Sequence, residues 1–307
     1  METRQAKHII SLADHGSYAR AAEALGITQS ALTQSIARFE SEIGVQLFDR
    51  GRFGAAPTEA GRLLLTRARA ISAENRLAHA ELDAFKGATR GDLLIGVGKS
   101  VVQHLIPEAL ARFARMRPNV VVTALEGWST DLFAQLLRGD LDFVVSAAVP
   151  SSAIDPELAQ QVLFEQHEVL VVGASHPLAG RKDVALADLV GQLWLAPPAG
   201  TGRVRQLQGV FQAAGLPAPV RFMRTDSVTL LFELVRLGVA IGWATVELMA
   251  EREDNSIVAL NIEELAMTRT ASITMRRRTR ASPLATVLIE EIKRVAAADL
   301  KRLGRAS

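Results

Sequence analysis

Residues 16–40 read GSYARAAEALGITQSALTQSIARFE and predict two short helices joined by a tight turn. Ser17 is placed to cap the first helix, and the alanines that follow are good helix formers with small side chains. Gly26 suits the turn because glycine readily adopts a left-handed backbone conformation. Thr28 is placed to cap the second helix. The small residues allow the helices to pack closely, as a helix-turn-helix requires.

The second predicted helix has an apolar face and a polar face. Its apolar and small residues recur at spacings of three and four, which predicts one buried face. These residues are Ala31, Leu32, Ser35, Ile36 and Phe39. The other face carries amides and hydroxyls, which can bond to base edges or phosphate oxygens; a polar, solvated helix is the alternative. The candidate DNA-contacting residues of this face are Gln29, Ser30, Thr33, Gln34 and Arg38.

The run from residue 17 to residue 50, with PTEAG at residues 57–61, resembles the N-terminal domain of the LysR-type transcriptional regulators. The resemblance implies a winged helix-turn-helix DNA-binding domain over residues 1–58. Ser30 and Thr33 depart from the proline and serine that are usual in the family. The shared residues, which align without a gap, are Gly16, Ser17, Ala21, Ala22, Leu25, Gln29, Gln34, Ile36, Glu40, Gly44, Leu47, Phe48, Arg50, Thr58 and Gly61.

Composition limits the class of protein. A chain of 307 residues can form two or three domains, and the absence of cysteine excludes disulfides and thiolate catalysis. No apolar window is long enough to span a membrane, so we expect a cytoplasmic protein without a membrane partner. The first 90 residues hold 12 basic and 10 acidic side chains and therefore carry the whole net charge of +2. Phosphate contact is expected in that part of the chain.

The segment after the second helix, RGRFGAAP at residues 50–57, predicts a wing of two short strands. Arg50 and Arg52 are the candidate contacts of this wing to the DNA backbone. The alternative is a flexible loop with incidental charge. The wing would complete the DNA-binding domain.

Residues 59–85 predict one long helix within a linker region at residues 59–90, with a hinge at residues 87–91. An alternating spacing of four and three marks a heptad seam that could pair with a second copy of the chain. Docking on the same chain is the alternative. Dimerisation would place two recognition helices on a two-fold DNA site, and a tetramer is implied by the resemblance. The seam residues are Leu64, Ala68, Ile71, Asn75, Ala78, Leu82 and Phe85.

The remainder, residues 91–307, alternates strands with helices and predicts an α/β domain with a parallel sheet covered on both faces. It resembles the family's effector domain, which implies a two-lobed periplasmic-binding-protein-like fold. Lobe 1 would comprise about residues 91–161 and 268–307, and lobe 2 about residues 162–267. The expected strands are 93–97, 120–125, 141–146, 168–172, 192–195, 239–243 and 271–275, and the expected helices 103–116, 131–138, 203–214, 230–237 and 283–302.

Hydroxyl and charged residues follow several expected strands, where open α/β sheets bind ligands. The resemblance implies that Ser100 and Ser129 hold an effector carboxylate, so we expect a small organic anion. Each hydroxyl could instead be a simple helix cap, and Trp128 or Trp243 could stack on a ligand or pack in the core. The candidate effector-binding residues are Lys99, Ser100, Trp128, Ser129, Pro198, Thr201 and Ser227.

No catalytic motif or metal-ligand spacing is present, so we expect neither an enzyme nor a cofactor or metal site. The basic run at residues 276–280 predicts a solvated strand end or a second DNA surface. The expected partners are double-stranded DNA, a small-molecule effector and further copies of the chain, with RNA polymerase a further candidate. The leading hypothesis is an effector-controlled DNA-binding regulator; the alternative is a small-molecule binding protein with a vestigial DNA-binding domain.

Overall fold

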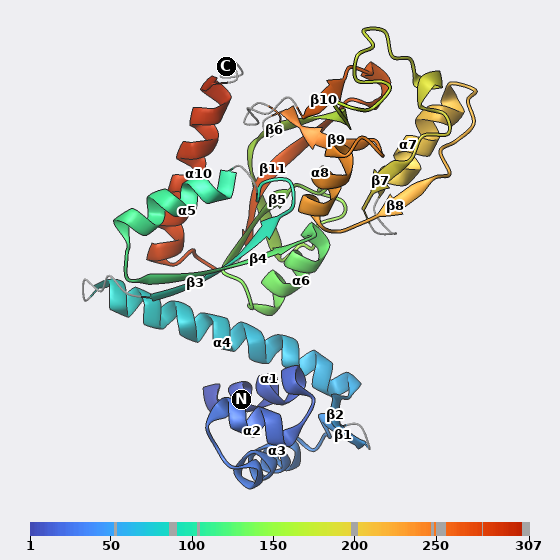
Figure 1. Ribbon diagram of the computed structural model, residues 1–307. Coiled ribbons are helices and arrows are strands. Elements are labelled where there is room, and N and C mark those ends of the chain that lie inside the picture. Colours follow the sequence, from blue (N-terminus) through green and yellow to red (C-terminus); the bar gives the residue numbers. More distant parts are fainter. Residues whose placement is uncertain are drawn as a thin grey trace. The chain divides into compact units, whose positions relative to one another are not determined.

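The computed structural model describes residues 1–302 except 52–53, 86–90, 103–104, 198–201, 247–248, 250–255 and 278 (Figure 1). The chain divides into two compact units. The first comprises Met1–Gly98, Ala109–Gln161 and Ile273–Lys293, and the second Lys99–Glu108, Val162–Ser272 and Arg294–Ser307. In the part of the chain that is described, no helix is long and apolar enough to cross a membrane.

The first unit begins with the helices α1 (Thr3–His15), α2 (Tyr18–Leu25) and α3 (Gln29–Ile43). The turn between α2 and α3 forms as expected: Gly26 has a φ of 66°, and the Thr28 hydroxyl accepts a hydrogen bond from the Ala31 amide. Ser17 occupies the N-cap position of α2 but makes no side-chain cap bond, so its predicted capping bond is wrong. The helix-turn-helix is therefore confirmed, with one cap fewer than expected.

The core of the helical region is formed by α1, α2, α3 and the start of the long helix. Leu32, Ile36 and Phe39 are buried on α3 as predicted, but Ala31 is exposed. Ala31 lies in the first turn of α3, beside the Thr28 cap. The buried face of α3 is thus narrower than the predicted one.

The wing is a two-stranded antiparallel sheet of β1 (Phe48–Gly51) and β2 (Gly54–Pro57). Its second strand lies against the end of α1, since the Ala55 amide donates to the Gly16 carbonyl at 2.8 Å. Gly54 has a φ of 120°, and a Cβ there would lie 2.1 Å from the Gly16 oxygen. Glycine at position 54 therefore permits the wing to approach α1.

The linker helix α4 (Glu59–Phe85) begins at Thr58, whose hydroxyl accepts from the Gly61 amide at 3.0 Å. The N-terminal half of its predicted seam is not free. Ala68 is buried in the helical core, and Leu64 and Ile71 pack against that core. The alternative of docking on the same chain therefore holds for this half, because α1 lies along it. Leu82, in the other half, is 55% exposed.

The α/β part of the first unit contains a parallel arrangement of β3 (Gly91–Gly98) between β4 (Val120–Gly127) and β5 (Phe143–Ala147). The helix α6 (Ser129–Arg138) connects β4 to β5, and α5 (Leu105–Met116) precedes β4. The strand β4 was expected to be covered on both faces, but Val121 is 60% exposed. The face of β4 that carries Val121 therefore lacks a cover among the described elements, and β4 is also the last strand of its sheet.

The second unit is built on the long strand β6 (Leu158–Gly173), which pairs antiparallel with β9 (Gly242–Thr245) and β10 (Ile257–Leu260). The prediction of a wholly parallel sheet is therefore wrong. A smaller parallel pair consists of β7 (Trp194–Ala196) and β8 (Phe222–Arg224). The helices of this unit are α7 (Gly202–Ala213) and α8 (Val228–Arg236), and 3₁₀ turns lie at Leu186–Leu189 and Glu263–Leu265. The last strand and helix in chain order are β11 (Met267–Arg276) and α10 (Pro283–Arg302).

Candidate DNA-binding helix and ligand site

The polar face of α3 is open to solvent. Gln29, Ser30, Gln34 and Arg38 are exposed, and Thr33 is partly exposed. The Ser30 hydroxyl lies 3.1 Å from the hydroxyl of the capping Thr28. These side chains lie away from the buried face, so they are free to meet the edges of bases in a groove.

Two polar contacts hold α3 in place. The His8 Nδ1 atom of α1 lies 2.7 Å from the Ser35 hydroxyl of α3, and burial, helped by Arg4, lowers the pKa of His8. At the other end of α3, the Glu40 carboxylate accepts hydrogen bonds from the amides of Leu47 and Phe48 at 2.7 and 3.2 Å. Glu40 thereby fixes the entry to the wing relative to the recognition helix.

The wing arginines are only partly described. Arg50 lies in β1 opposite Ala55. Its side chain, and the whole of Arg52, lie outside the described residues. Their contact with DNA stays a prediction.

A pair of incompletely bonded polar side chains lies in the second unit. Gln166 of β6 is 2% exposed, and its amide nitrogen donates to the Ser100 carbonyl at 3.1 Å. The Gln166 Oε1 atom and the Ser100 hydroxyl are both buried, and neither has a hydrogen-bond partner among the described residues. Since a buried polar atom without a partner is costly, these two atoms indicate a place for a bound polar group.

A buried charge cluster adjoins this pair along β6. Glu168 lies two residues from Gln166, so both side chains project from the same face of the strand. Arg203 of α7 forms a salt bridge with the Glu168 Oε2 atom, and Arg269 of β11 contacts the same oxygen at 3.1 Å. The Arg203 guanidinium also lies 5.0 Å from the centre of the Trp243 ring. Burial lowers the pKa of Arg203 to about 10, although Glu168 opposes this shift.

The tryptophan at position 243 is part of the lobe 2 core as well as of this cluster. Its ring lies 5.2 Å from the Trp194 ring, and its Nε1 atom is buried with no hydrogen-bond partner in the described part of the chain. The packing alternative for Trp243 therefore has direct support. One face of the ring is taken by Arg203.

The remaining effector candidates have varied surroundings. The Ser129 hydroxyl donates to the Ala147 carbonyl at 3.1 Å and does not cap α6, whose N-cap position is Trp128. Ser227 is an exposed cap of α8, accepting from the Leu230 amide at 3.2 Å. Lys99 is partly exposed. Pro198 and Thr201 lie outside the described residues.

The basic run at residues 276–280 is solvated only in part, because Arg277 and Arg280 are exposed, as expected for a solvated strand end, whereas Arg276 is not. Arg276 is partly buried and donates to the carbonyls of Leu136 and Leu141, both at 2.8 Å. Arg277 donates to the Pro156 and Leu158 carbonyls at 3.0 and 3.1 Å. The guanidinium groups therefore satisfy backbone oxygens, a role that the charge pattern alone did not indicate.

Comparison with known proteins identifies both the helix-turn-helix region and the α/β region. The family model described as "Bacterial regulatory helix-turn-helix protein, lysR family" matches residues 3–62, and the "LysR substrate binding domain" matches residues 86–297. The chain belongs to the LysR family of transcriptional regulators. It is therefore a DNA-binding regulator with a substrate-binding domain, and not an enzyme. Because the DNA-binding family model matches residues 3–62, the vestigial alternative is set aside.

Similar LysR-type proteins span nearly the same length. The SDS degradation transcriptional activation protein of Pseudomonas sp. (strain ATCC 19151) is 33% identical over 84% of each chain. The HTH-type transcriptional regulator CbbR of Xanthobacter flavus is 28% identical over 98% of this chain and 90% of its own. The solved structure of ArgP from Mycobacterium tuberculosis has a TM-score of 0.74 at 18% identity, covering 97% of this chain and 98% of its own, which shows a shared fold.

Sequence reasoning about this LysR-type regulator missed Gln166, Glu168, Arg203 and Arg269. Residues 165–168 read EQHE and are polar throughout, so no alternation in the sequence distinguishes the buried Gln166 and Glu168 from their neighbours. No spacing rule connects them with Arg203 or Ser100. In the described part of the chain, no group of three or more His, Asp or Glu residues could hold a metal ion.

Proposed function

We propose that this regulator responds to a small organic anion that binds between the two lobes of its effector domain. The observation that carries the proposal is the pair of unsatisfied buried atoms, Gln166 Oε1 and the Ser100 hydroxyl. Gln166 Oε1 can only accept, so it calls for an N–H or O–H group on the ligand. The Ser100 hydroxyl can donate or accept and suits a carboxylate or a hydroxyl oxygen.

The charge cluster supports an anion over a neutral ligand. Arg203 and Arg269 share the single carboxylate of Glu168, so these three groups carry a net positive charge. A buried cation that is incompletely neutralised favours a nearby anion, because the local dielectric is low. A small acid that also carries a hydroxyl or an amine would satisfy both parts of the site. We expect the candidates Lys99, Ser129 and Thr201 to contribute further polar contacts to the ligand.

The output of the regulator would be altered DNA binding. We expect Gln29, Ser30, Thr33, Gln34 and Arg38 of α3 to enter the major groove and Arg50 and Arg52 of the wing to contact the backbone. The part of α4 that carries the exposed Ala78 and Leu82 would pair with a second copy, and dimers would assemble into a tetramer. A ligand shifts such an assembly only if it binds one arrangement better than the other. RNA polymerase is a further candidate partner.

Thermal unfolding with a panel of small acids tests the effector site. The panel contains hydroxy acids, aromatic acids, sugar acids and amino acids, each at several concentrations. An acid that raises the Tm of the natural protein should do so much less in Ser100→Ala and in Gln166→Leu. Gln161→Leu, at an exposed position on the same strand, is the matched control. Equal Tm shifts in all four proteins would show that the site is misplaced.

A further inference from the structure

The linker helix α4 approaches the turn between α6 and β5 very closely. Gly139 has a φ of 77°, and a Cβ at this position would lie 2.8 Å from the Ala73 Cβ and 3.0 Å from the Arg69 carbonyl oxygen. Ala73 is only 5% exposed. Only a residue without a side chain allows the two backbones to come this close, so the turn is shaped for α4.

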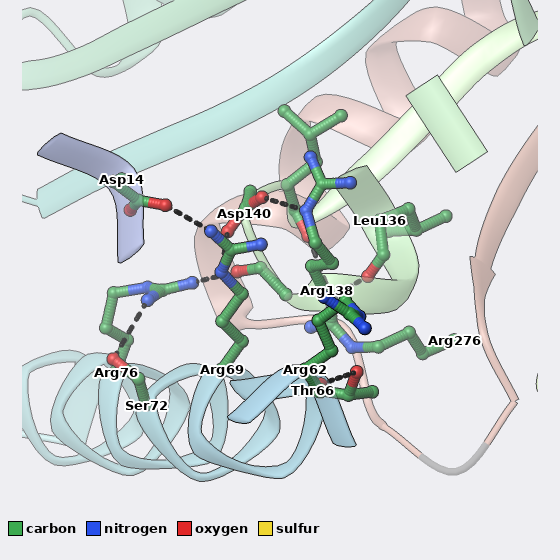
Figure 2. Close-up of polar contacts among 12 residues, drawn as sticks. Asp14, Arg62, Thr66, Arg69, Ser72, Arg76, Leu136, Arg138, Asp140 and Arg276 are labelled. Carbon is green, nitrogen blue, oxygen red and sulfur yellow. Dashed lines mark hydrogen bonds and ion pairs between the residues drawn. The ribbon is translucent and has the colours of Figure 1, made fainter. Parts of the chain in front are cut away.

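Charged side chains surround this approach (Figure 2). Arg69 of α4 lies between Asp14 of α1 and Asp140 of the turn, forming a salt bridge with Asp14 and placing its Nε atom 3.7 Å from the Asp140 Oδ1 atom. Its side chain is 11% exposed. Two turns further along α4, Arg76 donates to the Gly139 carbonyl. We call the group formed by Arg69, Ala73, Arg76, Gly139 and Asp140 the latch contact. It joins two regions that are distant in sequence.

The charged side chains of the latch contact would keep ion-pair partners if α4 moved away from the turn at Gly139. Asp140 also forms a salt bridge with Arg138 of its own turn, at 2.9 Å, shorter than its distance to Arg69. Arg69 retains Asp14, which lies in the DNA-binding domain together with the start of α4. Separation would thus leave no isolated buried charge, which is the usual large cost of breaking a buried ion pair. A contact of this kind can open and close at modest cost.

Both sides of the contact lead to functional regions. On one side, Asp14 lies in the last turn of α1, and the Gly16 carbonyl just beyond it holds the wing strand β2. On the other side, α6 runs from the candidate effector residue Ser129 to the turn at Gly139. A translation of α6 along its axis, or a rotation about that axis, would move the turn at Gly139 against α4. The contact therefore lies on a continuous path of packed elements within one unit.

We propose that the latch contact is a conformational switch that couples lobe 1 to the DNA-binding domain. It holds α4 and the helix-turn-helix in one arrangement against the turn at Gly139, and its release frees them to take another. The connection of the latch contact to Ser129 rests on the proposed effector site. The coupling of the latch contact to DNA binding does not rest on that site. By linkage, if release of the contact changes DNA affinity, DNA binding must change the equilibrium constant between the closed and released contact by the same factor.

The protein contains no cysteine, so one introduced thiol reports on the contact without interference. Ala73→Cys places a thiol under the Gly139 turn, and Ala78→Cys places one on the exposed part of the same helix. In the full-length protein, Cys at position 73 should react with a maleimide at least tenfold more slowly than Cys at position 78. Adding Asp140→Asn should accelerate the reaction at position 73 at least threefold, whereas Asp131→Asn, an exposed change on α6, should not.

A second readout leaves position 73 unchanged, in case a cysteine there disturbs the packing. Hydrogen exchange of a peptide covering residues 139–142 should be faster in Arg69→Gln than in the natural protein. Arg67→Gln, an exposed change on α4, is the control and should leave the exchange unaltered. Circular dichroism and binding to random DNA establish that each variant is folded. Equal thiol reactivity at positions 73 and 78, together with unaltered exchange in Arg69→Gln, would overturn the contact itself.

Coupling is tested with duplex DNA from upstream of the protein's own gene, at saturation. The DNA should change the maleimide rate at position 73 at least twofold, and Asp140→Asn should change the affinity for that DNA at least twofold. An unchanged rate and an unchanged affinity would reduce the contact to static packing and overturn the switch. None of these measurements needs a ligand, so failure of the proposed effector site would leave their outcome intact.

Discussion

Gln29 is the first residue of α3, and its exposed amide can donate and accept at once, as adenine recognition in the major groove requires. Gln29→Ala should therefore weaken binding to the specific site by about 1–3 kcal/mol and leave binding to random DNA nearly unchanged. Fluorescence anisotropy with both DNAs measures the difference. Gln212→Ala, exposed on α7, is the control. An equal loss on both DNAs would refute base reading by Gln29.

His176 is the residue whose titration should appear in the stability of the protein. Burial lowers its pKa, and its Nδ1 atom accepts a hydrogen bond from the Leu178 amide at 3.2 Å, which requires the neutral ring. The unfolded chain therefore binds this proton more readily than the folded chain. The resulting stabilisation is fully present above the ordinary pKa of about 6.5 and is lost as pH falls through the lowered folded value.

Because of this dependence, the urea concentration at the midpoint of unfolding should fall as the pH is lowered from 7 to 5. His176→Asn keeps an oxygen acceptor for the Leu178 amide but has no titrating group, so the fall should be shallower. Gln212→Asn, exposed on α7, is the control and should retain the original slope. A steeper or identical slope in His176→Asn would contradict the assignment to this ring.

At the scale of elements, Arg276 joins the end of β11 to the last turn of α6. Its two bonds to the Leu136 and Leu141 carbonyls are charge-assisted, and such bonds contribute more than neutral ones. Arg276→Met should lower the free energy of unfolding by about 2 kcal/mol, because it leaves both carbonyls without this donor. Urea titration measures the loss. Arg280→Met, at an exposed position, should change stability little; similar losses in both variants would argue against this role.

The linker helix is the element expected to bind a second copy. Its first half is occupied by α1, so the free part of the seam begins beyond Ile71 and includes the exposed Leu82. Leu82→Glu should weaken self-association by about tenfold or more, since an apolar contact is lost in each copy. Sedimentation at several concentrations measures this. Leu63→Glu, exposed but off the seam, should sediment like the natural protein, and an unaffected Leu82→Glu would place the interface elsewhere.

The sequence predicted elements best where local chemistry determines them. The helix-turn-helix follows from Gly26 and Thr28, and the start of α4 from Thr58, because turns and caps depend on neighbouring residues. The exposure of β4 and the antiparallel partners of β6 depend on strand order, which periodicity does not encode. The site shows the same division. Ser100 was predicted from its place after a strand and stays a candidate, whereas Gln166 meets it only through folding.

At the scale of the whole molecule, two compact units must combine DNA binding with ligand response. The net charge is nearly balanced beyond residue 90, so attraction to phosphates comes mainly from the N-terminal region. The exposed groups on α3 that we expect to read bases are mostly uncharged, with Arg38 the exception. We therefore expect the amides of α3 to recognise the base sequence and the basic side chains to attract DNA of any sequence.

That separation predicts how salt should act on the oligomer. Binding of two winged helix-turn-helix domains neutralises several phosphates each and releases their counterions, so affinity should fall by about a thousandfold or more between 50 and 200 mM salt. Anisotropy against DNA from upstream of the protein's own gene, with random DNA as control, measures both slopes. The slopes should be similar while the upstream DNA binds more tightly, because base contacts add affinity that salt barely affects. A salt-independent affinity for folded, oligomeric protein would contradict the phosphate contacts assigned to the N-terminal region.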